Sequence, residues 1–146
     1  MNFNKFTIKS QEAVQKAIEI TRSSGSQAIE PVHLLKGVMT EGDSLVKFVF
    51  QKVGANIAQL TVMIDKAISS LPKVSGGEPY FSRETNDVLQ KSLDVAKDNG
   101  DEYVTIEALL LALYLVKSQA STILKDLGLN EKDVREILGK DADSFL

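Results

Sequence analysis

The sequence contains no cysteine and a single histidine, His33. A chain without cysteine has no thiol nucleophile, and one histidine is too few for a two-histidine metal site. The phosphate-binding pattern G-x-x-x-x-G-K-[ST] is also absent. These absences argue against thiol catalysis, a histidine-based metal site and P-loop nucleotide binding. We expect His33 to be a hydrogen-bonded packing residue.

The chain also lacks a cluster of basic residues and a long apolar run. Its formal net charge is -3, and Lys and Arg gather nowhere, so no nucleic-acid partner is expected. The longest apolar run, 108–116, is far shorter than the roughly 20 residues of a membrane span. Residues 1–5 do not lead into the apolar segment of a signal peptide. We expect no membrane partner and a cytoplasmic location, which the lack of cysteine also suits.

What the sequence does contain is an internal repeat of about 75 residues. Residues 6–39 align without a gap on residues 81–114, with identical pairs such as Phe6/Phe81, Gly25/Gly100 and Leu34/Leu109. With 146 residues and 43% hydrophobic content, the two units are expected to share one core. The prediction is a single domain, 1–146. It comprises repeat one (about 6–71), a linker (72–80), repeat two (about 81–139) and a tail (140–146).

The sequence pattern of each repeat predicts four helices. No stretch alternates apolar and polar residues for long enough to predict a strand. Residues suited to the first positions of helices stand before apolar residues at helical spacing; they include Thr7, Pro31, Asn56, Ser82 and Thr105. The predicted fold class is all-α, with eight helices as two pseudo-twofold four-helix units. The helix after Thr105 is apolar on nearly every side, so the rest of the chain has to bury it.

Acidic residues gather in front of this helix. Asp98, Asp101 and Glu102 precede it, and Glu107 lies in its first turn. One interpretation is a solvated loop followed by an acid that the helix N-terminus stabilises. The other is an acidic rim beside an apolar groove, able to hold a chain that presents N–H groups, Lys or Arg. The residues alone leave both open.

The seam between the repeats is a second candidate site. The apolar residues on and before this helix exceed what one helix face requires; they include Tyr103, Leu111, Leu115 and Val116. We expect most of them in the core and a minority lining a groove near the pseudo-twofold axis.

Four motifs agree in order and spacing with a known family. They are F-T-I-K-S-Q-E-A at 6–13, I-E-P-V-H-L-L at 29–35, L-P-K-V-S-G-G at 71–77 and D-E-Y-V-T-I-E at 101–107. Together they resemble the amino-terminal domain of the Clp family of AAA+ unfoldases, and the ClpB disaggregase branch most of all. The resemblance spans essentially the whole chain.

The resemblance implies a non-catalytic domain that contacts exposed hydrophobic segments of unfolded or aggregated proteins. ATP and Mg²⁺ would bind only in ATPase modules beyond residue 146, so no cofactor is expected in this chain. The whole protein would be a hexamer, with a co-chaperone system as a further partner, and the excised domain a monomer. The family's functional threonine, aspartate and glutamate fall on Thr7, Asp101 and Glu107. Tyr103 and Ala108 complete the expected client-binding residues.

Two alternatives remain beside this reading. One is an adaptor-docking or phosphoarginine-recognising domain of a protease-linked Clp unfoldase. The branch that recognises phosphoarginine has a glutamate in both repeats, whereas Val32 takes that position here and Ala108 replaces a frequent histidine. The more remote alternative is a small enzyme that uses the acidic cluster.

Overall fold

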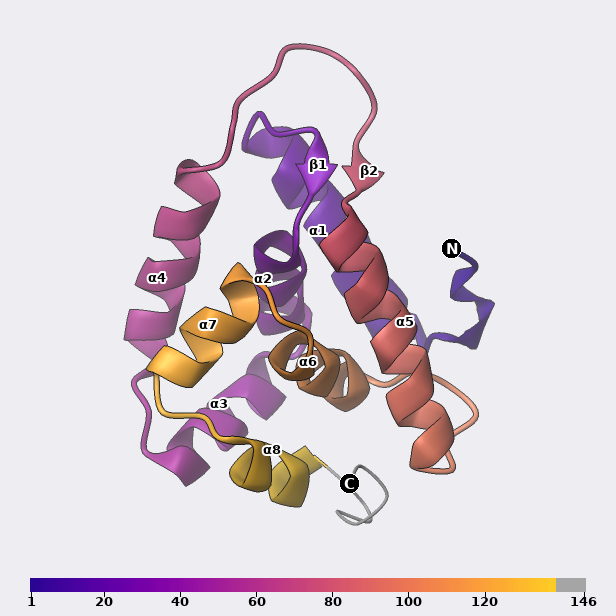
Figure 1. Cartoon of the computed structure of the whole chain (residues 1–146), viewed down its shortest axis with the longest axis vertical. Coiled ribbons are helices and arrows are strands. Elements are labelled where there is room, and N and C mark those ends of the chain that lie inside the picture. Colours follow the sequence, from indigo (N-terminus) through magenta and orange to yellow (C-terminus); the bar gives the residue numbers. More distant parts are fainter. Residues whose placement is uncertain (139–146) are drawn as a thin grey trace.

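The computed structural model describes residues 1–138, and the described part is predominantly helical (Figure 1). Its helices are α1 (Ile8–Ser23), α2 (Pro31–Glu41), α3 (Asp43–Val53), α4 (Ile57–Ser69), α5 (Arg83–Asp98), α6 (Ile106–Leu115), α7 (Gln119–Asp126) and α8 (Glu131–Leu138). A short 3₁₀ helix η1 (Phe3–Lys5) precedes α1, and two short strands, β1 (Ala28–Ile29) and β2 (Tyr80–Phe81), precede α2 and α5. The all-α prediction is confirmed. The predicted tail, 140–146, lies outside the described residues.

Side-chain caps begin the helices where the sequence predicts them. The side chains of Thr7, Ser82 and Thr105 each accept a hydrogen bond from the backbone N–H three residues on. Each bond satisfies one of the N–H groups that a helix start leaves without a partner. Helix α3 ends at Gly54, whose φ of 71° is the left-handed conformation that glycine adopts at little cost.

Helix α6 lies at the centre of the molecule. Every residue from Ile106 to Tyr114 is buried except Glu107, and the helix contacts α1, α2, α5, α7 and α8. The predicted burial of this helix is therefore confirmed, and one core serves both repeats. Among the described residues no single helix is long and apolar enough to cross a membrane; α6 and α7 meet that test only as a pair, bent by 93°.

Short parallel pairings join the two repeats. Strand β1 pairs with β2 in the register Ala28↔Tyr80 and Ile29↔Phe81, and a single bridge pairs Phe6 with Val104. The expectation of no strand was therefore wrong. Alternation of apolar and polar residues needs at least four residues to be visible, and these strands have two.

Side-chain hydrogen bonds from each repeat to the other stabilise these pairings. The Ser10 hydroxyl on α1 donates to the Val104 carbonyl at 2.9 Å, and the Thr85 hydroxyl on α5 donates to the Ile29 carbonyl at 2.7 Å. Each repeat therefore holds its first helix against the entry to the second helix of the other repeat. The predicted pseudo-twofold arrangement of the two units is present.

The segment between the repeats leaves α4, arches over one end of the molecule and returns as β2 beside the turn between α1 and β1 (Figure 1). Its last predicted residue, Tyr80, is already in β2. The linker is thus held against repeat one by strand pairing at its end.

Candidate functional site

Two of the predicted site residues, Thr7 and Glu107, line one pocket of about 500 Å³. Three chain segments meet there: the start of α1, the turn from α2 to α3 and the start of α6. The lining residues are Thr7, Lys9, Glu41, Gly42, Asp43, Ser44, Leu45, Thr105, Ile106 and Glu107. We call this the α1–α6 pocket.

The wall of the pocket depends on a close approach at Gly42. A Cβ atom at this position would lie 2.7 Å from Cγ2 of Ile106 and 3.0 Å from the Val38 carbonyl oxygen. Only glycine lets the α2–α3 turn rest directly on the first residue of α6. Ile106 and Leu45 give the pocket apolar surface.

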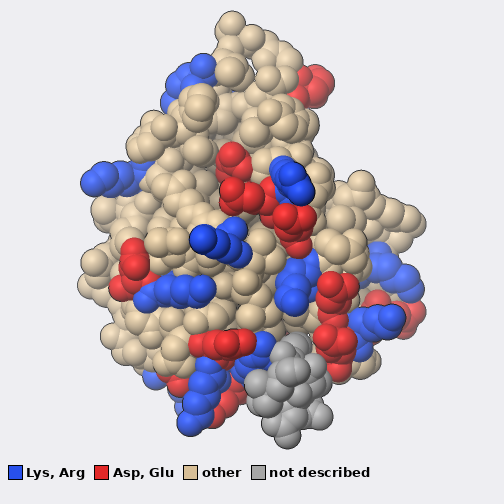
Figure 2. Space-filling model, viewed as in Figure 1, with Lys and Arg blue, Asp and Glu red and all other residues tan. Residues whose placement is uncertain are grey.

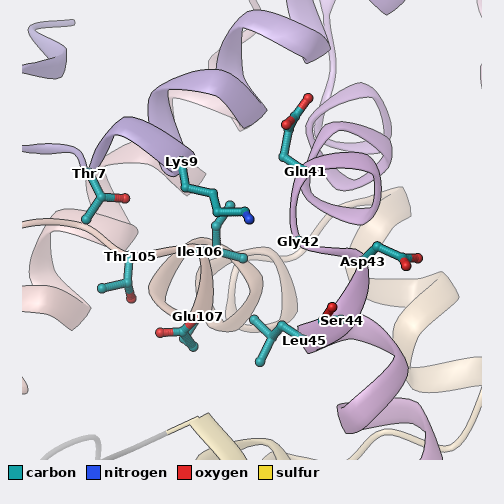
Figure 3. A pocket seen from close by; sticks show the side chains of 10 residues that line it. All are labelled: Thr7, Lys9, Glu41, Gly42, Asp43, Ser44, Leu45, Thr105, Ile106 and Glu107. Atoms are coloured by element: carbon teal, nitrogen blue, oxygen red, sulfur yellow. The ribbon is translucent and has the colours of Figure 1, made fainter.

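The pocket is predominantly acidic. Glu41, Asp43 and Glu107 supply three carboxylates against the single ammonium group of Lys9, and Asp43 also pairs with Lys47 on α3 at 3.0 Å. The face of the molecule drawn in Figure 2 carries side chains of both signs side by side and no broad basic area. In Figure 3 the Lys9 side chain extends from α1 over the middle of the view, with the acids around it. Such a rim favours partners that bring N–H groups or cations.

The Thr7 hydroxyl makes two hydrogen bonds within the local structure. It accepts the Ser10 backbone N–H at 3.1 Å and donates to the Ser10 hydroxyl at 2.8 Å, which in turn donates to the Val104 carbonyl. The chain of hydrogen bonds fixes the entry of α6 relative to α1. Thr7 is therefore placed to position Glu107 through the backbone that leads to it.

Asp101 lies in a different pocket. It lines a groove of about 620 Å³ beside α5, together with Lys5, Lys97 and Glu102 among others, and its carboxylate accepts a hydrogen bond from Asn99 Nδ2 at 2.8 Å. The structure thus brings Thr7 and Glu107 together and separates Asp101 from them. Val104, which α1 holds through Ser10, also lines this second groove and so lies between the two sites.

The two remaining predicted residues line neither pocket. Tyr103 is 45% exposed and presents its ring on the surface. Ala108 is 5% exposed, and its N–H donates to the Thr105 hydroxyl at 3.1 Å. A buried methyl group offers a client little surface, so a contact role for Ala108 has weak geometric support. Of the surplus apolar residues, Leu111 is buried, while Leu115 and Val116 are half-buried.

Sequence reasoning missed part of this surface. Ile8, directly after the cap of α1, is 75% exposed. The α2–α3 turn, which forms one side of the pocket, is more than 60 residues from Thr105 in the sequence, so only the tertiary fold brings it there. The detectable signal was Ile8 itself, an apolar residue off the buried face that carries Val14 and Ala17.

His33 packs in the core, as the sequence predicts. It is fully buried, and its Nδ1 accepts the Glu30 backbone N–H at 2.9 Å. Burial, and secondarily the positive charge of Lys73, lower the pKa of His33 to about 4. The imidazole is therefore neutral at pH 7. No group of His, Asp and Glu among residues 1–138 is arranged to hold a metal ion.

Comparison with known sequences assigns the chain to a family. The model described as the Clp repeat (R) N-terminal domain matches residues 5–127. The chain is 57% identical over 140 residues to chaperone protein ClpB of Bacteroides thetaiotaomicron, a match that covers 96% of this chain and 16% of that protein. It is 53% identical over 132 residues to ClpB of Porphyromonas gingivalis, covering 90% and 15%. The chain spans about a sixth of the length of these curated relatives.

A solved structure shares the fold. The Hsp104 N-terminal domain from Candida albicans superposes with a TM-score of 0.82 at 18% identity, over 92% of this chain and 89% of that one. The family model covers most of the sequence, and relatives more than half identical cover nearly all of it. The chain belongs to the Clp repeat N-terminal domain family.

Proposed function

We propose that this chain is the client-engaging amino-terminal domain of a ClpB-type protein disaggregase. It holds exposed apolar segments of unfolded or aggregated proteins before their delivery to the ATPase rings. The observation that carries the proposal is the α1–α6 pocket, which combines apolar and acidic groups at the start of two helices. The identity with two ClpB proteins over at least 90% of the chain supports it.

The residues at the pocket and beside it have different roles in client binding. Leu45 lines the pocket as a half-buried apolar side chain, and the exposed Ile8 lies in sequence between the lining residues Thr7 and Lys9. This apolar surface supplies most of the affinity for an unfolded segment. Glu107 lies in the first turn of α6 and is half-buried, so its carboxylate accepts N–H groups or cations of the client. Thr7 acts by positioning, because the cap already uses its hydroxyl.

The arrangement favours this function over phosphoarginine recognition in both repeats. The counterpart of Glu107 in repeat one is Val32, which is 1% exposed and part of the core. An acid is missing at that position, and the side chain there faces away from solvent. Recognition through paired acids therefore has no second site in repeat one.

The rest of the protein belongs to the same proposal. The chain covers 16% of the Bacteroides thetaiotaomicron relative, and ATP with Mg²⁺ acts in modules beyond residue 146. The full protein forms a hexamer in the cytoplasm and works with a co-chaperone system. The isolated domain is a monomer that binds clients without turnover.

The test replaces Glu107 by Gln and measures binding of a stably unfolded protein, reduced carboxymethylated α-lactalbumin, by fluorescence anisotropy at low ionic strength. We expect binding about fivefold weaker, since one charged contact is lost, and a free energy of unfolding changed by less than about 0.5 kcal/mol. Glu84→Gln is the matched control, because Glu84 lies in the first turn of another helix, α5, and does not line the pocket. Equal affinity of the Glu107 and Glu84 variants, or no binding to the parent domain, would contradict the proposal.

A further inference from the structure

Helix α5 ends in a turn that contains Asn99 and Gly100, the only Asn-Gly pair in the sequence. The Gly100 N–H donates to the Lys97 carbonyl at 3.0 Å. The Asp101 N–H donates to the Ala96 carbonyl at 2.8 Å. The side chain of Asn99 donates from Nδ2 to Asp101 Oδ2 at 2.8 Å. Backbone and side-chain hydrogen bonds therefore both hold this pair in place.

An Asn-Gly pair can lose ammonia without an enzyme. The backbone nitrogen of the glycine attacks Cγ of the asparagine, the bond from Cγ to Nδ2 breaks, and Nδ2 leaves as ammonia with the proton of the glycine N–H. Water then hydrolyses the five-membered cyclic imide at either carbonyl, which gives aspartate or isoaspartate. Glycine hinders the attack least because it has no side chain. By this route Asn99 is the most reactive asparagine of the sequence.

The folded turn opposes the reaction. The nitrogen that has to attack donates its proton to the Lys97 carbonyl, and the amide group that has to leave is bound to Asp101. The ψ angle of Asn99 is -1°. Ring closure requires its Cβ and the Gly100 nitrogen to be nearly eclipsed about the Cα–C bond, which tetrahedral geometry at Cα places far from this angle. The end of α5 therefore has to open before the ring can form.

Repeat one has the same turn without the reactive residue. Ser24 aligns with Asn99, and the glycine that follows, Gly25, has the same φ of 76° as Gly100. The Gly25 N–H donates to the Arg22 carbonyl at 3.2 Å. A serine side chain has no amide carbon and forms no cyclic imide. The backbone conformation of this turn therefore does not require asparagine, and serine is the natural replacement for it.

The acid product is poorly suited to the turn. The Asn99 side-chain oxygen is buried, so a carboxylate at this place would be poorly solvated. The carboxylate would face that of Asp101, which accepts a hydrogen bond from the amide. It would also add negative charge at the C-terminus of a helix, the end that favours cations. Either product should weaken the turn from which the chain runs to Val104 and its pairing with Phe6.

We propose that Asn99 is a site of spontaneous deamidation that the folded turn suppresses, and that its conversion to an acid loosens the segment leading into α6. The reaction proceeds only in molecules in which the end of α5 has opened. Local opening of this kind needs less free energy than global unfolding. The amount of acid at position 99 therefore measures the time that the turn has spent open. Client binding plays no part in this chemistry.

The first experiment follows deamidation of the 146-residue chain in mildly alkaline buffer by mass spectrometry of its proteolytic peptides. A synthetic peptide of residues 95–104 is the reference. We expect the folded chain to react at least about tenfold more slowly than the peptide, because only the opened fraction of molecules reacts. Urea that unfolds the chain should raise its rate to that of the peptide. Asn99→Ser, which copies Ser24 of repeat one, should remove the fast reaction in urea. Equal rates in the folded chain and the peptide, or a faster reaction at another asparagine, would overturn the inference.

The second experiment tests the effect of the product. Asn99→Asp copies one of the two products, and amide hydrogen exchange measured by NMR compares it with Asn99→Ser and the parent chain. The Val104 N–H, which donates to the Lys5 carbonyl at 2.7 Å, should exchange about fivefold faster in the Asp variant, because charge repulsion favours the open turn. The Ser variant should exchange at the rate of the parent chain. Equal exchange at Val104 in the Asp and Ser variants would refute the loosening of this segment.

Discussion

The two repeats share a scaffold and differ where their second helices begin. In both, the cap of the first helix passes a hydrogen bond to a hydroxyl and then to a carbonyl of the other repeat. At the second helix, repeat one has the buried Val32 and His33, where repeat two has Glu107 and Ala108. The shared positions hold the fold together. The positions that differ free a carboxylate in repeat two, and there the candidate site is found.

The largest expected effect concerns a core position at which the two repeats differ. Gly37 in α2 corresponds to Ala112 in α6, but a Cβ atom on Gly37 would lie 2.3 Å from the Ala13 carbonyl oxygen of α1. Gly37→Ala should lower the free energy of unfolding by about 3 kcal/mol, because backbone atoms must move apart. Urea denaturation measures it.

The reverse substitution is the control for this pair. Ala112→Gly should cost about 2 kcal/mol, because the helix loses propensity and the core loses the buried methyl group of Ala112. Equal losses of unfolding free energy for Gly37→Ala and Ala112→Gly would contradict the prediction. They would mean that α1 and α2 can move apart at little cost.

The next largest effect concerns His33, whose counterpart in repeat two is Ala108. Since the pKa of His33 is about 4 in the folded chain and about 6.5 in the unfolded chain, the unfolded state binds more protons between these values. The contribution of the neutral imidazole is present above pH 6.5 and is lost as pH falls toward 4. The loss between pH 7 and pH 5 should be about 2 kcal/mol.

Carboxylates also titrate in acid, so the measurement is a difference. Chemical denaturation at pH 7 and at pH 5 is compared between the parent chain and His33→Gln, which keeps an acceptor for the Glu30 N–H. The variant should lose less stability over this interval. An identical pH dependence of the unfolding free energy in the parent chain and the variant would show that His33 does not contribute to it.

The smallest expected effect concerns the two helix caps, at which loss of stability and loss of client binding can be measured separately. Thr7→Ala and Ser82→Ala each remove one helix cap and should each cost about 1 kcal/mol. Only Thr7→Ala should also weaken binding of the unfolded client, because only Thr7 positions the entry of α6. Thr7→Ser should restore both. Equal binding by the two alanine variants would leave Thr7 with a structural role alone.

Much of this arrangement was predictable because it is local. Caps such as Thr7 and Thr105 act within four residues, and the burial of α6 follows from its composition. The separation of Asp101 from Glu107 was not predictable, because it depends on the irregular backbone of residues 101–105 and on its pairing with a distant chain segment. The role of Gly42 also depends on packing against a helix more than 60 residues away.

The hydrogen bonds exchanged between the repeats bear on the ancestry of the fold. A chain with one repeat would carry both partners of this contact, the hydroxyl on its first helix and the carbonyl before its second. Two such chains would pair as a symmetric dimer through identical surfaces. Duplication and fusion of the gene would preserve that pairing within one polypeptide. Each copy would then be free to diverge, as the buried Val32 and the half-buried Glu107 at equivalent positions show.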